Sequence, residues 1–373
     1  MHNLRNIYSE TFPVALPVAF PELFGHRVEQ SQMATIKDIA SYCNVAVSTV
    51  SRVLNNHPDV SASTRKKVLK AAHDLHYVRN TSARDLALQP TNSIGLVVRG
   101  SENPFFTSII ASIEASCEAR DYSMVLHQIP VTADEVVEGA RLVQSKRLKG
   151  LILLGGRYDY TREDVEAFGV PFVCCAYTNR FGKLDPADFS SVSIDDKVEA
   201  YRATKMLIDN GHTKIAILLD SAHDRSVSEC RYRGYCDALA DAGIPLDEGL
   251  VCETMDFEMR AAFERVTRLM AERPDVTAIF AEADIMAIAA IKAAHDAGLT
   301  IPDDISIISI DGIELSRFTT PTLTAFTQPQ TLMGQKAVEI LVEVLDNAAP
   351  CSHVRLETTL RPGGTVGHVR TET

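Results

Sequence analysis

The stretch VAVSTVSRVLNN (Val45–Asn56) carries side chains suited to reading a DNA groove. On a helix starting at about Val47, one face is apolar and consists of Val50, Val53 and Leu54. The opposite face consists of Val47, Ser48, Ser51 and Arg52. Short side chains let a helix approach a major groove closely, and an Arg guanidinium can contact a guanine edge with two hydrogen bonds. The stretch predicts helix-turn-helix DNA binding; an ordinary three-helix unit with a polar exposed face is the alternative.

A second set of polar and aromatic residues follows apolar runs or begins helices later in the chain. Carboxylates and an Arg fork that converge with aromatic rings suit a small polyhydroxylated ligand. The candidate effector-binding residues are Phe105, Phe106, Asp195, Arg231, Phe257, Asp284, Asp311 and Gln328. Asp195 and Asp284 have an alternative role as helix caps, and Phe105 and Phe106 as core residues. Arg231 and Asp311 are the pair we expect first.

The sequence shows no motif of an enzyme or of a metal site. GxGxxG, P-loop, GxSxG and HExxH patterns are absent. The acidic pairs Asp195/Asp196 and Asp303/Asp304 lack a nearby basic or metal-binding constellation. The eight cysteines form neither a CxxC pair nor a Cys/His grouping and read as reduced thiols. We therefore expect no enzymatic activity, no cofactor and no metal.

Charge is distributed unevenly along the 373 residues. The net charge of −12 argues against nucleic acid when taken as one number. Between Ala34 and Asn92, however, eight Lys and Arg face four Asp, whereas residues 93–373 hold 27 cations and 42 anions. A small basic head on a large acidic body is the asymmetry expected when only the head meets DNA.

Three helical elements must position the first set of residues. Thr35 precedes IKDIASYCN with Asp38 three residues on, which is typical of a capping box, and Ser61 begins a helix over residues 62–75 in the same way. The weakly helical stretch from Val47 lies between these two helices. Its stability must therefore come from packing on them.

The second set needs strands and helices in alternation. Apolar runs such as SIGLVV, GLILLG, KIAILL and SIISID are separated by amphipathic helical stretches through residues 93–373. Alternating β and α segments form parallel sheets covered on both faces, with ligand clefts at the carboxyl ends of the strands. We expect an α/β core of two doubly wound parallel-sheet subdomains. This pattern resembles a periplasmic-binding-protein-like core, and by that resemblance one subdomain holds about residues 93–192 with a return segment near 328–345, and the other holds about 193–326 with the final strand region.

The segment TIKDIASYCNVAVSTVSRVLNN, continuing through VSASTRKKVLKAAHDLHYVRN, resembles the head of LacI/GalR-type (lactose-repressor family) transcriptional regulators. The resemblance continues through the body and implies a periplasmic-binding-protein-like core, an operator of pseudo-palindromic double-stranded DNA, a homodimer and a small-molecule effector such as a carbohydrate. The function it implies is a DNA-binding repressor under effector control. A free-standing periplasmic-type binding protein remains the alternative for the body, but it would need an export signal and no basic head.

The resemblance also assigns roles to single residues. It implies base-reading positions at Val47, Ser48 and Arg52, and phosphate or helix-face contacts at Thr49 and Ser51. The expected DNA-binding residues are Thr35, Val47, Ser48, Thr49, Ser51, Arg52, Asn55, Asn80, Arg84 and Leu86.

The segment from Asn80 to Gln89, stopped by Pro90, has a helical pattern too short to be stable alone in water. By resemblance it is a hinge helix that folds on DNA, with Leu86 wedged into the minor groove. The alternative is a linker whose leucines touch the body.

Four departures from the family pattern stand out. Asn44-Val45-Ala46 replaces the usual Gly-Val-Ser, so the Ser cap of the second helix is missing. Arg79 replaces the usual Pro. Ala176 and Ala283 stand where many sugar-responsive relatives carry Asp and Asn. Two polar contacts are thus absent, which points to an effector that is a modified sugar, a smaller molecule or not a sugar.

The expected organisation has four parts. Residues 1–33 form a disordered tail or extra sequence before Met33, residues 34–79 the DNA-binding head, 80–92 the hinge and 93–373 the core. The sequence contains no apolar run of the roughly 18–20 residues that a membrane span needs and no export signal, so we expect a cytoplasmic protein. No long heptad tail follows Arg361, which favours a dimer over a tetramer.

Overall fold

The structure is a computed structural model that describes residues 36–54, 57, 59–75, 92–100, 103–255 and 257–370. The chain divides into two compact units, Met1–Leu88 and Gln89–Thr373. The expected tail, the hinge segment and its Leu86, and Arg79 lie outside the described residues.

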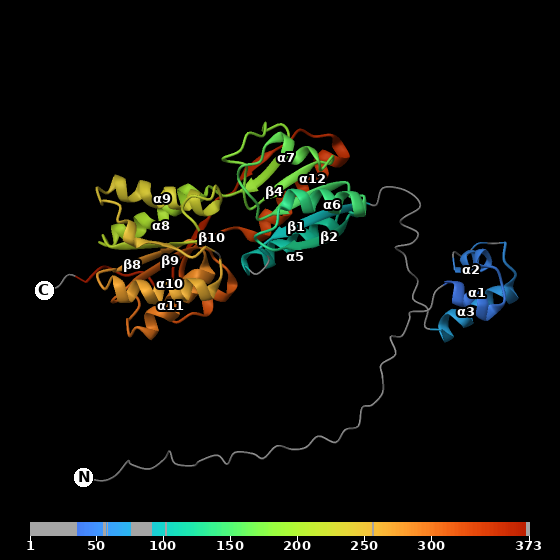
Figure 1. Ribbon diagram of the computed structural model, residues 1–373, viewed down its shortest axis with the longest axis horizontal. Helices are drawn as coiled ribbons and strands as arrows, with labels where there is room; N and C mark the ends of the chain where they lie inside the picture. Colours follow the sequence, from blue (N-terminus) through green and yellow to red (C-terminus); the bar gives the residue numbers. More distant parts are fainter. Residues whose placement is uncertain are drawn as a thin grey trace, which may run out of the picture. The chain divides into compact units, whose positions relative to one another are not determined.

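The first unit contains three helices, α1 (Ile36–Cys43), α2 (Val47–Leu54) and α3 (Ala62–Asp74) (Figure 1). All three contribute to one small apolar core, made of Ile39, Ala40, Cys43, Val50, Val53, Val68 and Ala71. The start of α2 at Val47 agrees with the sequence prediction. Ser61 precedes α3 as expected, and its Oγ accepts a hydrogen bond from the Thr64 N–H at 3.3 Å.

The turn between α1 and α2 depends on Asn44, which has a left-handed φ of +49°. The Asn44 N–H donates to the Ser41 C=O at 3.2 Å, and the Val45 N–H donates to the Ala40 C=O at 3.0 Å. This pair of bonds is the Schellman arrangement that ends a helix, and Asn is among the few non-glycine residues that tolerate it. Asn44 therefore ends α1, so that α2 begins at Val47 with no Ser cap.

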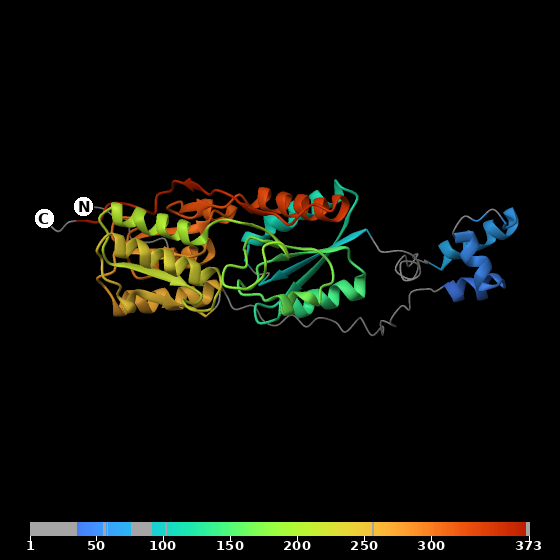
Figure 2. The same ribbon diagram turned by 90° about the horizontal axis from the view of Figure 1, so that it is seen from above.

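The second unit contains two lobes, each built on a six-stranded sheet (Figures 1 and 2). In the first lobe the strand order is β11-β5-β4-β3-β1-β2, and every neighbouring pair is parallel. The strands are β1 (Ser93–Arg99), β2 (Ser123–Ile129), β3 (Gly150–Leu154), β4 (Phe172–Cys175), β5 (Ser190–Ser193) and β11 (His353–Arg355). The helices are α5 (Phe105–Glu118), α6 (Glu135–Lys146), α7 (Arg162–Glu166) and α12 (Gln330–Asn347).

Alternate side chains of the first sheet pack on opposite faces, as the two-residue period of a strand requires. Ile152 and Cys175 belong to the cluster that includes α5 and α12, whereas Leu153 and Cys174 belong to the cluster that includes α6. Figure 2 shows α12 and α6 on opposite faces of the strands. The near-continuous apolar runs of these strands are explained by this double burial.

The second lobe has the strand order β12-β10-β9-β8-β6-β7, parallel except for β12. Its strands are β6 (Ile215–Leu219), β7 (Val251–Glu253), β8 (Ala278–Ala281), β9 (Ser306–Asp311), β10 (Thr324–Thr327) and β12 (Thr359–Arg361). Its helices are α8 (Asp196–Asp209), α9 (Val227–Asp241), α10 (Met259–Glu272), α11 (Asp284–Asp296) and the 3-10 helices η1 (Glu248–Leu250) and η2 (Glu314–Phe318). The predicted pair of doubly wound parallel-sheet subdomains is thus confirmed.

The chain passes between the lobes three times, after β5, after β10 and after β11. The first-lobe return is longer than the sequence predicted, because β11 at His353–Arg355 pairs with β5 beyond the expected segment 328–345. Among the described helices, none is long and apolar enough to cross a membrane.

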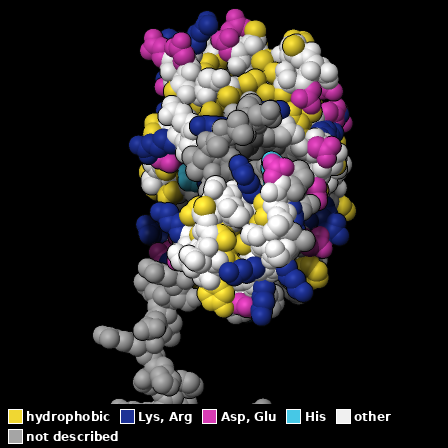
Figure 3. Space-filling view, turned by 90° about the vertical axis from the view of Figure 1, so that its right-hand side faces the viewer, with side chains coloured by type: hydrophobic (Ala, Val, Ile, Leu, Met, Phe, Trp, Pro, Cys, Tyr) yellow, Lys and Arg dark blue, Asp and Glu magenta, His cyan; other side chains and the backbone are white. Residues whose placement is uncertain are grey.

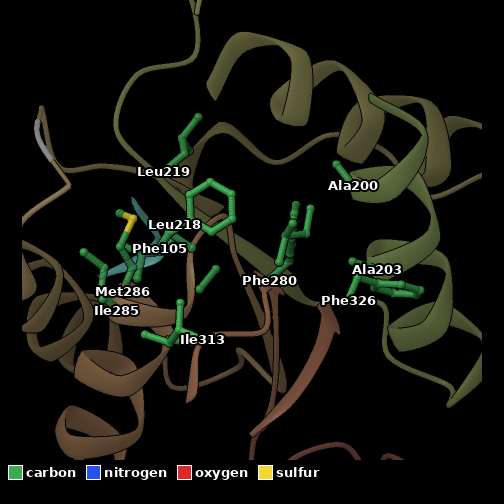
Figure 4. Close-up of a cluster of buried hydrophobic side chains, with 14 of the residues drawn as sticks. Phe105, Ala200, Ala203, Leu218, Leu219, Phe280, Ile285, Met286, Ile313 and Phe326 are labelled. Carbon is green, nitrogen blue, oxygen red and sulfur yellow. The ribbon is translucent and has the colours of Figure 1, made fainter. Parts of the chain in front are cut away.

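One large apolar cluster includes residues of both lobes. Figure 4 shows part of it, with Phe280 and Leu218 of the second sheet close together. Phe105 of α5 belongs to the same cluster and is 5% exposed. Core packing is therefore shared by the two lobes, and Phe105 belongs both to this core and to the wall of a cavity.

Candidate functional site

The exposed face of α2 carries the residues predicted to meet DNA. Val50 and Val53 are buried, whereas Val47, Ser48 and Arg52 are exposed. Val47, a β-branched apolar residue, is 43% exposed although the small core lies beside it. Thr49 and Ser51 are half-buried. Thr35, Asn55, Asn80, Arg84 and Leu86 lie outside the described residues.

Cations outnumber carboxylates in the described part of the first unit. Lys37, Arg52, Lys66, Lys67 and Lys70 are exposed and Arg65 is half-buried, whereas the described part of this unit has only Asp38, Asp59 and Asp74 as carboxylates. In Figure 3 both Lys and Arg side chains and Asp and Glu side chains stand out on the face turned to the viewer. A positive surface with a slim helix face is suited to phosphate contacts and close groove approach.

The second unit holds a cavity of about 540 Å³ lined by both lobes. Its walls come from the carboxyl ends of strands, including β1, β2 and β3 of one sheet and β6, β9 and β10 of the other. In each sheet the strand order reverses beside the first strand of the lobe, between β1 and β3 or between β6 and β8. Ligands of open α/β sheets bind outside such reversal points.

Six of the eight predicted effector-binding residues line this cavity: Phe105, Phe106, Arg231, Phe257, Asp311 and Gln328. They come from five places in the sequence, which the fold brings together; Phe257 lies between β7 and α10. Phe105 and Phe106 begin α5, Arg231 lies on α9, and Asp311 and Gln328 follow two adjacent strands.

Arg231 is the centre of a buried polar network and is 4% exposed. Its Nε and Nη2 donate to Asp196 Oδ1 at 3.1 and 2.9 Å, and its Nη1 donates to the Glu282 C=O. The Tyr158 hydroxyl of the first lobe donates to Asp196 Oδ2 at 3.2 Å. Burial by itself would lower the pKa of Arg231, but the neighbouring carboxylates of Asp196, Asp311 and Glu282 raise this pKa by a larger amount. The pKa of Arg231 therefore lies above its ordinary value, and the guanidinium stays charged.

Asp311 lies opposite Arg231, with Oδ1 3.9 Å from Arg231 Nη1. The same oxygen accepts a hydrogen bond from Gln328 Nε2 at 2.9 Å. Burial raises the pKa of Asp311 to about 8, against the lowering effect of Arg231. Its φ of +123° is unusual for a residue with a side chain, and such strained positions cluster at functional sites.

Aromatic rings form the first-lobe wall of the cavity. Tyr158 and Tyr177 line it with ring centroids 5.5 Å apart. Phe105 and Phe106 stand 5.6 Å apart at the start of α5. Flat apolar faces beside hydroxyls and amides can cover one face of a sugar ring while the polar groups bond its hydroxyls.

Two predicted residues do not line the cavity, and the structure explains each. Asp195 is the N-cap of α8, where its Oδ1 accepts from the Val198 N–H at 3.3 Å, and it faces Arg180 and Arg355. Asp196, one residue later, is the carboxylate that meets Arg231. The sequence pattern could not tell these neighbours apart.

Asp284 is fully buried below the cavity wall. Its carboxylate accepts from Ser309 Oγ at 2.6 Å, from the Ile313 N–H at 2.8 Å and from Ser316 Oγ. It therefore anchors the turn after β9 and has no surface on the cavity. The two alanines that depart from the family pattern lie in different places: Ala176 lines the cavity, whereas Ala283 is buried outside it.

The sequence reading missed several polar residues that line the cavity: Arg99, Asn103, Gln128, Tyr158, Tyr177, Asp220, Asp224 and Glu258. A signal for half of them was present. Arg99 is the last residue of β1 and Gln128 the second-to-last residue of β2, and Tyr177 and Asp220 follow shortly after β4 and β6. Applying the strand-end rule to every strand would have found them.

Models of two protein families match the chain. The family described as bacterial regulatory proteins, lacI family, matches residues 35–80. The periplasmic binding protein-like domain matches residues 204–366.

Curated and solved relatives match nearly the whole length. The HTH-type transcriptional regulator MalR of Clostridium butyricum is 41% identical over 327 residues, which are 87% of this chain and 97% of that protein. A structure of the transcriptional regulator CelR with cellobiose superposes with a TM-score of 0.66 at 27% identity, covering 89% of this chain and 99% of that one. The lac repressor dimer bound to operator and the anti-inducer ONPF gives 0.63 at 25%, covering 90% and 100%.

Proposed function

The chain belongs to the LacI family of bacterial regulatory proteins, and from this membership we propose how it recognises DNA and which ligand controls it. It is a DNA-binding transcriptional regulator under the control of a small-molecule effector. The alternative of a binding protein without DNA function is set aside, because the regulatory family model matches residues 35–80.

The proposed DNA contacts lie on the exposed face of α2. Val47, Ser48 and Arg52 read base edges in the major groove, and Thr49 and Ser51 contact phosphates or support the helix. The slimness of this face and the exposed cations around it support the assignment. Thr35, Asn55, Asn80, Arg84 and Leu86, which lie outside the described residues, are further proposed contacts because of the family resemblance.

The proposed effector is a sugar or a sugar derivative. The observation that carries this proposal is the cavity of about 540 Å³ in which Arg231, Asp311 and Gln328 form a polar base beside aromatic walls. The volume lies inside the range of about 300–1,000 Å³ that ligand sites occupy. CelR, which superposes on this chain, was solved with cellobiose.

The proposed assembly is a homodimer on a pseudo-palindromic operator. The lac repressor was solved as a dimer on its operator. In this chain Phe318 and Leu315 of η2 are 76% and 53% exposed, and two neighbouring apolar side chains of this kind could be buried between two copies of the chain. Sedimentation of the protein as a dimer, weakened by Phe318→Asp, supports this assembly; a monomer that still binds a two-fold operator contradicts it.

The proposed control acts through the angle between the lobes. A ligand between the lobes contacts both of them, and the lobes are joined by three chain crossings, so binding can favour one angle between them. The first lobe begins with β1, the first strand after the DNA-binding unit, so a change in this lobe can reach that unit. A regulator of this kind works on DNA in the bacterial cytoplasm, which is where we propose that the protein acts.

Operator selection followed by ligand titration tests the proposed function. Selection from random duplexes with the full chain should yield a two-fold symmetric site, and a thermal-shift screen of sugars and nucleobases should give at least one sugar that stabilises the protein. Failure to enrich any sequence would contradict the DNA assignment. Stabilisation by nucleobases alone would contradict the sugar assignment.

A further inference from the structure

Helix α12 begins at the cavity. Gln330, its first residue, donates from Nε2 to the Asp311 C=O at 3.1 Å. Two residues earlier, Gln328 donates from its N–H to the same carbonyl at 3.1 Å and from Nε2 to Asp311 Oδ1 at 2.9 Å. Asp311 is the last residue of β9 in the second lobe, whereas α12 packs on strands of the first lobe. A ligand that contacts Asp311 and Gln328 therefore acts directly on the start of a first-lobe helix.

The body of α12 packs closely on α5 through small side chains. Gly334 lies against the Ile109 C=O, since a Cβ added to this glycine would be 2.8 Å from that oxygen. Ser112 Oγ of α5 donates to the Thr331 C=O at 2.6 Å. Small sliding of packed helices is one way in which proteins transmit a domain movement. With 18 residues α12 is about 27 Å long, so it reaches from the cavity to the opposite edge of the first sheet.

The far end of α12 is bonded to that opposite edge. Asp346, one residue before the end of α12, accepts a hydrogen bond from the Tyr122 hydroxyl at 2.7 Å. Tyr122 is buried and directly precedes β2. Burial and the bond to Asp346 raise the pKa of Tyr122 to about 12, so the hydroxyl keeps its proton and acts as the donor.

The same edge holds the residue from which the chain leads to the DNA-binding unit. Asn92 directly precedes β1 and is the first described residue of the second unit. Its C=O accepts from the Ser123 N–H at 2.9 Å and its Nδ2 donates to the Asp121 C=O, so it is bonded on both sides of Tyr122. Lys149 Nζ donates to Asn92 Oδ1 at 2.7 Å and lies 5.4 Å from the centroid of the Tyr122 ring. Tyr122 thus lies between the end of α12 and the residues that hold Asn92.

We propose that α12 couples the cavity to the attachment of the DNA-binding unit, with Tyr122 as the positioning residue at its far end. The proposal rests on the proposed control by an effector and names the residues that transmit it. A ligand that moves Gln328 moves the start of α12, and the bond between Tyr122 and Asp346 passes the displacement to the residues around Asn92. Coupling between two sites is reciprocal, so operator binding must also change the cavity end of α12.

Hydrogen exchange of the full chain, with and without operator, tests the proposal without a known effector. The probe is the duplex selected with the wild-type protein. Operator should change the exchange of amides in residues 330–336 of the wild-type protein. In Tyr122→Phe, which keeps the ring but lacks the donor, this change should be at least threefold smaller. No change in the wild-type protein, or a full change in Tyr122→Phe, overturns the proposal and leaves DNA recognition intact. If selection yields no operator, the proposed DNA function fails and the coupling falls with it.

Three further variants separate coupling from stability. Tyr201→Phe removes a matched bond in the second lobe, from the Tyr201 hydroxyl to Asp241 Oδ2 at 3.1 Å, and should keep the wild-type response. Asp346→Ala removes the acceptor at an exposed position and should reproduce the loss, which decides the matter if Tyr122→Phe folds poorly. Asp346→Asn keeps an acceptor oxygen and should restore most of the response. A full response in Asp346→Ala, or equal losses in Tyr201→Phe and Tyr122→Phe, would contradict the proposal.

Discussion

Arg52 is the residue whose contribution to DNA recognition can be measured most cleanly. Its side chain is exposed on α2, and a guanidinium that bonds a guanine edge discriminates against other bases by about 1–3 kcal/mol. Arg52→Ala should therefore remove the preference at one operator position. Competition binding against operators altered one base pair at a time measures this.

Lys66→Ala is the matched control for Arg52→Ala. Lys66 is an exposed cation of the same unit, so its loss should weaken all sequences about equally and lower the salt dependence of binding. A uniform loss over all sequences in Arg52→Ala would reassign Arg52 to the phosphates.

Asp311 and Asp195 give a matched pair for the cavity, since the sequence alone treated both as ligand contacts. Asp311→Ala removes a side chain that faces the ligand and leaves Gln328 Nε2 without its acceptor, and a buried polar group left without a partner costs about 1–3 kcal/mol. The dissociation constant of the sugar should rise at least tenfold in calorimetry. Asp195→Ala should leave it within about twofold, because Asp195 caps α8 outside the cavity. Equal losses in both variants would contradict the assignment.

Glu282 should make the protein less stable as the pH rises. Burial raises its pKa to about 8, although Arg231 lowers it, and Oε2 has no hydrogen-bond partner among the described residues. Between its ordinary pKa and pH 8 the native state binds one more proton than the unfolded chain. Stability therefore falls with rising pH through this window, by at most about 1.4 kcal/mol per pH unit.

Glu282→Gln tests that pH dependence. The amide cannot titrate, and its oxygen can still accept from the Asp220 N–H and Ser228 Oγ. Urea unfolding of both proteins between pH 5 and pH 8 should show a shallower decline for the variant. Parallel pH profiles would mean that Glu282 is ionised in the native protein.

At the scale of elements, the sequence predicted most of what the structure shows. The spacing of the apolar residues predicted which face of α2 is buried, and the apolar runs predicted the buried strands. The sequence could not separate Asp195 from Asp196, because which of two adjacent carboxylates turns inward depends on the residue at which α8 begins. The sequence also could not show that the Asp284 carboxylate is fully hydrogen-bonded by the turn after β9. Its partners Ser309, Ile313 and Ser316 lie far from it along the chain.

Asn44 gives a prediction at the scale of elements, because its left-handed backbone ends α1 just before α2 begins. Its left-handed backbone costs other side chains about 1–2 kcal/mol. Asn44→Ala should therefore destabilise the first unit by about 1 kcal/mol and weaken operator binding, whereas Asn44→Gly should be tolerated. Hydrogen exchange of the α1–α3 amides measures this local stability. Unchanged exchange in Asn44→Ala would mean that the turn does not depend on the left-handed residue.

At the scale of the whole molecule, effector control requires that ligand binding in the cavity and DNA binding at α2 are energetically coupled. The cavity contacts both lobes, and the bond between Tyr158 and Asp196 ties the first lobe to the arginine at its base. A ligand that binds there can therefore favour one arrangement of the lobes over another. Thermodynamic linkage then requires that the sugar and the operator change each other's affinity by the same factor.

The most direct test is to measure that factor from both sides with the full chain. Operator affinity is measured by fluorescence anisotropy with and without saturating sugar, and sugar affinity by calorimetry with and without saturating operator. We predict equal factors of about 5–150, in the same direction. A sugar that fills the cavity and leaves operator affinity unchanged would contradict the account.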